Sequence, residues 1–381
     1  MARAVSTCVH CGFCLAACPT YRVLGEEMDS PRGRIVLMKQ ALEGTLTTLE
    51  ARPYIDRCLG CLSCETACPS GVRYRELVVP FRTFIRRDAQ SASERLWQRT
   101  LVGTVESPAR FRAAILAAQL ARPLLRVLPV PLRSMALLLP RRLPPREKLP
   151  THVPSQGARR ARVALLAGCA QQVLRPSINR ATVRVLTANG VEVVIPGAQR
   201  CCGALSLHSG LAERAAAAAA HNAKVFPVDV DAILTNAAGC GSAMKEQSFS
   251  APVRDVVEFL DTLGVRTPMR LRKPAVVAYH DACHLAHGQE IRAAPRRLLE
   301  KIAGLTLVDI GDADLCCGSA GLYNIEQPDT AAELGRRKAS AVRATAAEIV
   351  ATGNIGCLTQ LAAHLTGIPV QHTLEVLDSA I

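Results

Sequence analysis

The sequence has few aromatic residues and lacks any long uncharged apolar run. Phe, Trp and Tyr make up 3% of its 381 residues. They form no stacking platform among the arginines, which argues against a nucleic-acid-binding protein. Arginines interrupt every apolar stretch before it reaches the roughly 18 residues that a membrane-spanning helix needs. Any membrane contact is therefore expected to be peripheral.

The sequence also lacks the signatures of an enzyme with its own organic active site. No G-x-G-x-x-G dinucleotide fingerprint follows a strand-like segment, and no Ser-His-Asp arrangement can be placed. The N-terminal segment MARAVSTCVHCG has no apolar stretch of the kind found in secretory signals. We therefore expect a cytoplasmic protein whose thiols stay reduced and free to bind iron, with peripheral contact at the inner face of the cytoplasmic membrane left open.

Cysteine, by contrast, is abundant: the chain has sixteen, and they fall in tight groups. Near the N-terminus the pattern C-x2-C-x2-C-x3-C-P occurs twice. A loop of this spacing supplies three thiolates to one [4Fe-4S] cube, and the fourth cysteine of each run ligates the other cluster. We therefore predict cluster 1 on Cys8, Cys11, Cys14 and Cys68, and cluster 2 on Cys58, Cys61, Cys64 and Cys18.

Two other uses of these cysteines fit the pattern less well. Zinc sites typically combine two separated cysteine or Cys/His pairs, and this spacing does not match a single tetrahedral centre. Disulfides between such close neighbours are disfavoured in a reducing compartment. The complete pattern, present twice, favours two iron–sulfur clusters.

A helix is expected between the two cysteine runs, in the segment SPRGRIVLMKQALEG. Ser30 can cap its start, and Gly44 can end it. Ile35, Met38 and Leu42 then share one face of the helix. The N-terminal module is therefore expected to be a helical ferredoxin.

Positive charge gathers in the segment that follows. The chain has a net charge of +14, and between Leu101 and Arg162 twelve Arg or Lys residues accompany only Glu106 and Glu147. Prolines interrupt any long helix there. Such a basic segment suits an anionic membrane or protein partner, and it equally suits a solvated linker. We expect residues 91–160 to form a basic, Pro/Arg-rich linker that is helical at its start.

The sequence from residue 161 onward contains two copies of one unit. ARVALLAGCA resembles PAVVAYHDAC, and the matched cysteines lie 114 to 117 residues apart in the two copies. Short apolar runs such as VALLAG, VEVVIPG and DAILTN alternate with Ala-rich segments of helical length. This alternation predicts an α/β fold with a largely parallel sheet, in which the cysteine groups follow the ends of strands.

Each copy holds four cysteines, and each set is a candidate site for a further iron–sulfur cluster. Two adjacent cysteines can serve one cluster only through a special turn, which the glycine after them permits. The alternative is that one copy has lost its metal. The candidate metal ligands are Cys169, Cys201, Cys202 and Cys240 in the first copy, and Cys283, Cys316, Cys317 and Cys357 in the second.

The paired Cys-Cys-Gly motifs resemble the cysteine-rich CCG domains of heterodisulfide reductases and lactate-utilisation proteins. They also resemble those of the iron–sulfur subunits of glycolate and anaerobic glycerol-3-phosphate dehydrogenases. In the fullest form of the motif a fifth cysteine follows, and the five hold non-cubane clusters. Here Ala243 and Gln360 stand at that position. This departure argues against disulfide-reducing chemistry, although four cysteines suffice for an ordinary cluster.

The sequence as a whole predicts an α+β multidomain protein, in which an N-terminal α-helical ferredoxin domain precedes two repeated α/β CCG domains. The expected domains are residues 1–90 for the ferredoxin with two [4Fe-4S] clusters, 91–160 for the linker, 161–270 for the first CCG copy and 271–381 for the second.

Four segments together resemble the family of glycolate oxidase iron–sulfur subunits: CVHCGFCLAACPTY, SPRGRIVLMKQALEG, YHDACHLAHG and HTLEVLD. The resemblance implies an electron-transfer subunit of a glycolate dehydrogenase. Such a subunit accepts electrons from flavin-containing subunits that oxidise glycolate to glyoxylate, and passes them toward a quinone and the respiratory chain. Equivalent subunits of lactate or anaerobic glycerol-3-phosphate dehydrogenases, and a heterodisulfide-reductase-like reductase, remain alternatives.

Polar residues near the clusters have two interpretations each. Arg32 and Arg34 are expected either to stabilise cluster charge or dock a partner, or to form surface ion pairs. The polar residues around Cys283 are candidate proton donors near a quinone or flavin, or groups that cap a helix and hydrogen-bond around this cysteine. These residues are His280, Asp281, His284 and His287.

Overall fold

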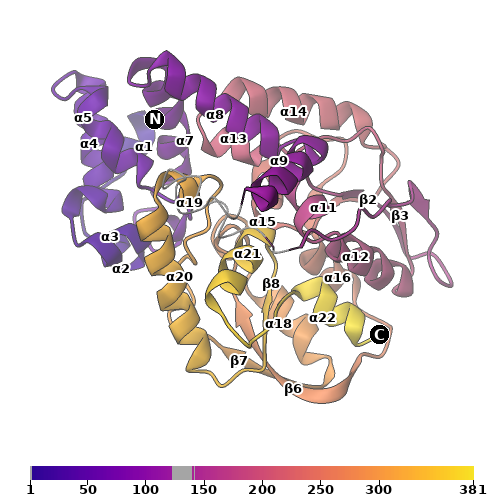
Figure 1. Ribbon diagram of the computed structural model, residues 1–381. Helices are drawn as coiled ribbons and strands as arrows, with labels where there is room; N and C mark the ends of the chain where they lie inside the picture. The colour runs from indigo at the N-terminus through magenta and orange to yellow at the C-terminus, as the bar shows by residue number, and fades with distance from the viewer. Residues whose placement is uncertain (1, 122–139, 141) are drawn as a thin grey trace.

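Three parts pack together in the computed structural model, which describes residues 2–121, 140 and 142–381 (Figure 1). A helical N-terminal module precedes two α/β units, each with its own sheet. This architecture confirms the expected α+β fold with a helical module and two repeated α/β units. Among the helices of the described residues, none is long and apolar enough to cross a bilayer.

Short helices surround one apolar core in the N-terminal module. Met38, Ile55, Leu77 and Phe81 are fully buried there. The two cysteine runs begin in the loops that precede α2 and α6. The elements are α1 (Ala2–Ser6), α2 (Phe13–Ala17), α3 (Pro19–Leu24), η1 (Glu27–Asp29), α4 (Pro31–Glu43), α5 (Thr48–Asp56), α6 (Ser63–Thr66) and α7 (Arg75–Asp88).

Helix α4 is the helix expected between the cysteine runs. The Ser30 hydroxyl accepts a hydrogen bond from the backbone N–H of Gly33 at its start. Gly44 ends it with a φ of 75°, the left-handed conformation that glycine adopts without steric cost. Ile35 and Met38 on its apolar face are buried, whereas Leu42 on the last turn is 44% exposed.

The expected linker begins as two packed helices. Val102 of the first helix packs against Leu211 of the first α/β unit and Leu322 of the second, so this segment touches both units. Most of the Pro/Arg-rich stretch, residues 122–139 and 141, lies outside the described residues. The two helices are α8 (Ala92–Val105) and α9 (Pro108–Leu120).

The first α/β unit has a five-stranded sheet of order β1-β3-β2-β4-β5, parallel except for the edge pair β1 and β3. Its strands are β1 (His152–Val153), β2 (Ala161–Leu166), β3 (Val191–Val194), β4 (Ala232–Thr235) and β5 (Val253–Asp255). Its helices are α11 (Ala170–Leu174), α12 (Ser177–Ala188), α13 (Ala204–His208), α14 (Ala212–Val225), α15 (Ala238–Lys245) and α16 (Val256–Leu263).

The second unit repeats this topology in a parallel sheet of order β7-β6-β8-β9, which matches β3-β2-β4-β5 strand for strand. Its strands are β6 (Arg270–His280), β7 (Ala303–Asp309), β8 (Ile349–Thr352) and β9 (Val370–His372). Its helices are α17 (Cys283–Ala286), α18 (Ala293–Glu300), α19 (Tyr323–Glu326), α20 (Pro328–Arg343), α21 (Ile355–His364) and α22 (Thr373–Ser379). The repeated strand order supports the tandem duplication.

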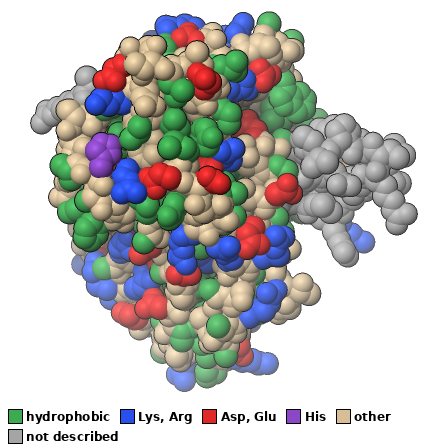
Figure 2. All heavy atoms as spheres, turned by 90° about the vertical axis from the view of Figure 1, so that its left-hand side faces the viewer, with side chains coloured by type: hydrophobic (Ala, Val, Ile, Leu, Met, Phe, Trp, Pro, Cys, Tyr) green, Lys and Arg blue, Asp and Glu red, His purple; other side chains and the backbone are tan. Residues whose placement is uncertain are grey.

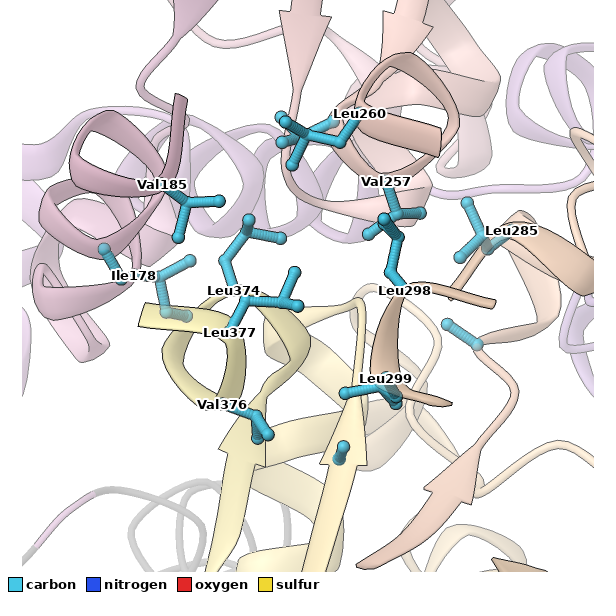
Figure 3. Packing of buried hydrophobic residues seen from close by; sticks show 14 of the residues in the cluster. Ile178, Val185, Val257, Leu260, Leu285, Leu298, Leu299, Leu374, Val376 and Leu377 are labelled. Carbon is cyan, nitrogen blue, oxygen red and sulfur yellow. The ribbon is translucent and has the colours of Figure 1, made fainter. Parts of the chain in front are cut away.

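One apolar core joins the two units, as Figure 3 shows. Helices α12 and α16 of the first unit pack against α22 and α18 of the second. Truncating a buried leucine to alanine in such a core costs about 2–5 kcal/mol. The shared core therefore holds the two copies in one arrangement. Its fully buried members include Ile178, Val185, Leu260, Leu298 and Leu377.

Equivalent helices in the two units begin with different capping residues. Asp255 accepts a hydrogen bond from Val257 N–H at the start of α16, and His372 Nδ1 accepts one from Leu374 N–H at the start of α22. Burial lowers the pKa of His372 to about 4, although the neighbouring Glu375 opposes this. Protonation of His372 Nδ1 would remove this hydrogen-bond acceptor. The folding stability that neutral His372 contributes is therefore lost as the pH falls from 6.5 through about 4.

We predict that His372→Asn flattens the acid dependence of stability, because asparagine caps helices well and does not titrate in this range. The apparent Tm of anaerobically purified protein, measured from pH 7 to pH 4, should fall less in this variant than in the wild type. His152→Asn removes an imidazole whose side chain is half exposed and serves as the control. Equal acid slopes for the wild type and H372N would contradict the prediction.

Candidate metal centres

The two N-terminal cysteine runs fold as the same loop-and-helix unit. His10 and Gly60 have φ values of 55° and 66°, and Gly12 and Leu62 have φ values of 86° and 64°. Members of each pair lie 50 residues apart in sequence, so both loops require left-handed backbone at the same two positions. Each loop places glycine at one position and accepts a strained side chain at the other, at a cost of about 1–2 kcal/mol.

These loops bring the eight N-terminal cysteines around two neighbouring pockets. Cys64 lies between the pockets and borders both. The other cysteines lining the first pocket are Cys8, Cys11, Cys14 and Cys68, and those lining the second are Cys18, Cys58 and Cys61.

The thiol environments separate the same two groups. Burial raises the pKa of Cys14 to about 11, and nearby Cys8 and Cys68 also raise it. Burial raises the pKa of Cys64 well above its ordinary value, and the three other cysteines of the second pocket raise it further. Close, buried thiols of this kind ionise readily only when a bound metal compensates for the negative charge. Cys64 therefore groups with the second pocket.

The first pocket lies at the surface of the molecule. Cys11 is exposed, and the neighbouring side chains of Val9 and Phe13 are 67% and 68% exposed. Figure 2 looks onto the side of the molecule that carries the N-terminal module, where acidic, basic and apolar side chains intermingle. A redox centre in the first pocket would thus be accessible to a partner protein.

The second pocket is covered by the second α/β unit. Leu59 and Cys61 form one apolar cluster with Leu315 and Cys316 of that unit. Burial raises the pKa of Cys61, and the nearby Cys283 of the second unit raises it further. The second pocket therefore lies directly against the cysteines of the second copy.

Polar contacts hold the N-terminal module in this position. Thr66 Oγ1 lies 2.6 Å from His287 Nδ1 in a hydrogen bond. The Tyr323 hydroxyl donates to the Arg57 carbonyl oxygen at 3.0 Å. Helix α20 of the second unit also contacts α3 of the module (Figure 1).

In the second copy, four cysteines from three parts of the chain meet at the carboxyl end of the sheet. Cys283 begins α17 after β6, Cys357 lies in α21 after β8, and Cys316 and Cys317 lie in the loop after β7. Their thiols are neighbours in the order Cys283, Cys316, Cys317 and Cys357, and the contacts shift the pKa values of the first three. Cys316, Cys317 and Cys357 are buried.

The glycine of each Cys-Cys-Gly motif lets a helix approach the cysteine loop. Gly203 and Gly318 have φ values of 84° and 90°. A Cβ atom on Gly318 would lie 2.6 Å from the Ala331 carbonyl oxygen, and one on Gly203 would lie 3.1 Å from the Ala215 carbonyl oxygen. The motif therefore needs glycine both for its turn and for its packing.

The first copy brings its four cysteines together in the same way. The Sγ atoms of Cys169 and Cys201 lie 3.3 Å apart, and Cys202 hydrogen-bonds to both Cys201 and Cys240. These hydrogen bonds lower the pKa of Cys201 well below its ordinary value and raise those of Cys169 and Cys202. The set is thus a compact group of four sulfur donors.

The first copy is more open than the second. A pocket lined by Arg110, Arg200 and Arg214 lies beside Cys169 and Cys201. Part of this positive charge is neutralised, because Arg214 pairs with Glu106 at 2.6 Å. The two copies therefore differ in accessibility: the first borders a basic surface pocket, and the second faces the N-terminal module.

Comparison with known proteins agrees with this architecture. Residues 4–72 match the 4Fe-4S dicluster domain, and residues 163–245 and 277–362 match the cysteine-rich domain CCG. The glycolate oxidase iron–sulfur subunit of Escherichia coli is 37% identical over 98% of this chain and 93% of its own length. The chain belongs to the glycolate oxidase iron–sulfur subunit family. The probable glycolate oxidase iron–sulfur subunit of Bacillus subtilis is 35% identical over 93% of the chain and 87% of its own length.

Two further proteins are more distantly similar to this chain. Lactate utilization protein A of Exiguobacterium is 29% identical over 58% of the chain and 98% of its own length. The crystal structure of a hypothetical protein from Helicobacter pylori matches with a TM-score of 0.56 at 9% identity, over 92% of this chain and 67% of that one. The latter similarity concerns the fold alone.

The chain binds two [4Fe-4S] clusters in its N-terminal module, and its residues fit them. The chemistry of the donors is appropriate, because all eight N-terminal cysteines carry free thiols and surround two pockets. When bound, the clusters supply one-electron redox chemistry. The protein's own residues position the sulfurs, exclude water and place charge nearby.

Arg34 places a fully buried positive charge beside the second pocket. Its guanidinium lies 3.8 Å from Cys18 Sγ, donates to Thr20 and pairs with Asp29 at 3.2 Å. Burial lowers the pKa of Arg34, but Cys58 and its other neighbours raise it by more, so it lies above its ordinary value. The interpretation of Arg34 as a surface ion pair is therefore wrong, because both partners of the pair are buried.

Arg32 lies at the first pocket instead. It forms an ion pair with Glu27 at 2.8 Å, and its Nη1 donates to the His10 carbonyl oxygen in the first cysteine loop. The side chain remains 30% exposed, so the ion-pair interpretation holds for this residue. The bond to His10 also supports the strained loop conformation.

The positions of the absent fifth cysteines are filled by structural residues. Ala243 is buried in the apolar core of the first unit. Gln360 donates to the Ala331 carbonyl oxygen at 2.8 Å and accepts from Asn324 at 2.6 Å. Gln360 thus ties α21 to α19 and α20.

None of the polar residues around Cys283 caps α17, whose first residue follows Ala282. Asp281 receives two hydrogen bonds from Arg296, and the His284 ring lies 4.9 Å from that of His208. His287 contacts the N-terminal module, as described above. His280 lies with Cys317 and Cys357 in one buried group. The helix-capping interpretation is therefore wrong.

Lys338 is a buried charge that was not predicted from the sequence. It is 1% exposed, its Nζ donates to the Asp312 carbonyl oxygen at 2.5 Å, and the nearby Cys317 and Cys316 raise its pKa against the larger lowering by burial. The signal was present: Leu334, Lys338 and Val342 follow one another at four-residue spacing on the buried face of α20. A lysine there indicates negative charge in the core.

We predict that Arg34→Met lowers the reduction potential of the cluster in the second pocket, because removing a buried cation disfavours the added electron. Loss of the buried ion pair should also lower the stability, although Asp29 keeps its ion pair with Arg57 at 2.8 Å. Redox titration followed by electron paramagnetic resonance measures the first effect, and denaturant unfolding the second. Two variants serve as controls: Arg34→Lys keeps the positive charge, and Arg32→Met removes a positive charge beside the first pocket. A potential unchanged in R34M would contradict the prediction.

Proposed function

We propose that this chain is the electron-transfer subunit of a flavin-dependent glycolate dehydrogenase complex. Flavin-containing subunits oxidise glycolate to glyoxylate, and the clusters carry the electrons toward a quinone and the respiratory chain. The observation that carries this proposal is the spatial order of the sites. The surface pocket is followed by the buried pocket, and the buried pocket lies against the buried cysteines of the second copy. The names of the relatives support a role as one subunit of a larger complex.

The two pockets support an assignment of the cluster ligands. Cluster 1 is held by the four cysteines of the surface pocket, and cluster 2 by the four that group in the buried pocket. The fourth cysteine of each run thus crosses to the other cluster, as this spacing requires. The ligands are Cys8, Cys11, Cys14 and Cys68 for cluster 1, and Cys58, Cys61, Cys64 and Cys18 for cluster 2.

Electrons enter at cluster 1 and leave cluster 2 toward the second copy. Val9 and Phe13 give the rim of the surface pocket an apolar character that suits a docked flavin subunit. Cluster 2 has no such exposed rim, because the second unit covers it. A two-electron donor such as reduced flavin can pass its electrons singly into this series of one-electron centres.

The substrate is tested by reducing the complex through its partner. With the flavin subunits present, anaerobic addition of glycolate should produce the electron paramagnetic resonance signals of reduced [4Fe-4S] clusters. D-lactate, L-lactate and glycerol-3-phosphate are the matched comparisons, and the isolated iron–sulfur chain with glycolate is the control. Clusters that remain oxidised with glycolate but are reduced by another substrate would overturn the substrate assignment.

The ligand assignment is tested by paired substitutions within one run. Cys14→Ser should alter the spectrum and potential of cluster 1, whereas Cys18→Ser, four residues later, should alter those of cluster 2. A chain in which each run holds its own cluster would show both effects at the same cluster. Measurement of the two potentials in each variant therefore separates the two arrangements.

A lactate dehydrogenase subunit is the second candidate function, favoured by the similarity to lactate utilization protein A. That relative covers 58% of this chain, whereas the glycolate oxidase subunits cover more than nine tenths of it. Glycolate is therefore the better supported substrate, and the comparison with lactate above separates the two.

A further inference from the structure

The second copy contains a nitrogen donor among its cysteines. His280 ends strand β6, and its side chain is 1% exposed. Its nearest ring nitrogen and the Sγ atoms of Cys317 and Cys357 all lie within 4.8 Å of one another. Histidine and cysteine at such mutual distances are the donors that transition metals prefer.

The His280 ring has no other partner in the part of the chain that the structure describes. Both Nδ1 and Nε2 are buried, and neither makes a hydrogen bond. Buried polar groups are nearly always hydrogen-bonded, because leaving them unpaired is costly. Two unpaired nitrogens on one buried ring therefore indicate a ligand that the ring contacts.

The backbone holds this ring in place before any ligand binds. His280 pairs with Thr352 in the parallel ladder between β6 and β8, at the centre of the second sheet. Cys357 follows Thr352 by five residues, and Asn354 Nδ2 lies 3.5 Å from its Sγ. The carboxyl ends of two adjacent strands thus bring nitrogen and sulfur donors together, as is usual for sites in such sheets.

The first copy provides an internal comparison. Leu166 ends β2 three residues before Cys169, as His280 ends β6 three residues before Cys283. Leu166 is buried among apolar residues and offers no ligand atom. The duplicated fold therefore tolerates an apolar side chain at this position, and the imidazole of the second copy is not needed to form the strand.

We propose that His280 is a nitrogen ligand of an iron–sulfur cluster in the second copy, where it takes the place of one of the four thiolates. The inference rests on the proposed electron-transfer function. Replacing a thiolate by a neutral imidazole raises the potential of an iron–sulfur cluster, because the ligand set carries less negative charge. The buried cation Lys338 acts in the same direction. The second copy then accepts electrons readily from the all-cysteine cluster 2 beside it.

The test uses the full chain, purified anaerobically after labelling with ¹⁵N-histidine. Pulsed electron paramagnetic resonance should show a directly bound histidine nitrogen in one reduced cluster. His280→Gln should abolish this coupling, and His280→Cys should retain the cluster while lowering its potential. His284→Gln is the matched control, since His284 is buried nearby but lies outside the donor group. It should retain the coupling.

Three results would overturn the proposal. The first is a histidine coupling that persists in H280Q, and the second is the weak coupling of a hydrogen-bonded ring in the wild type. The third is an iron content of about eight per chain in the wild type, the amount that two [4Fe-4S] clusters account for. In each case, glycolate-dependent reduction of the N-terminal clusters can still be observed, so failure of this inference is distinguishable from failure of the proposed function. Unchanged signals of clusters 1 and 2 in H280Q show that the variant is folded.

Discussion

Sixteen cysteine sulfurs lie in four close groups, and once ionised the members of each group repel one another. Burial makes this repulsion stronger, because little water is present to screen it. Bound metal ions would relieve most of the charge, and buried cations relieve part of the remainder. Arg34 beside the second pocket and Lys338 beside the second copy are such cations, and each is almost completely enclosed. Much of the surrounding structure depends on this compensation of negative charge.

Packing around the sulfurs explains why several unfavourable local features persist. Leu62 and His10 adopt left-handed backbone in the cysteine loops, although both carry side chains. Hydrogen bonds and burial within the module offset this strain. The Cys-Cys-Gly loops lie close against α14 and α20: a Cβ atom on Gly318 would clash with the Ala331 carbonyl oxygen, and one on Gly203 would be tightly packed against Ala215. The cysteine groups therefore shape the helices around them as much as the helices position the cysteines.

The duplicated half shows how one fold supports two different sites. The strands, the Cys-Cys-Gly turns and the shared core of α12, α16, α18 and α22 are common to both copies. Single side chains create the differences. Asn222 in the first copy and Lys338 in the second are equivalent residues. Each lies seven residues after the alanine that contacts the motif glycine, and each donates to a carbonyl oxygen in the loop before the paired cysteines. At the end of the first strand of each copy's CCG unit, apolar Leu166 in the first copy corresponds to His280 in the second. The second copy thus gains a cation and an imidazole within an unchanged frame.

The sequence by itself determined the features that depend on short spacings. The cysteine runs, the helix from Ser30 to Gly44, the alternation of strands and helices and the duplication were all predictable, because each is encoded within a few residues or a regular repeat. Tertiary structure alone decided which pocket is exposed and which faces the second copy. It also decided that His280 meets Cys317 and Cys357, and that Arg34 is buried. Those contacts join residues far apart in the chain, and spacing does not constrain them; only the packing of the three parts does.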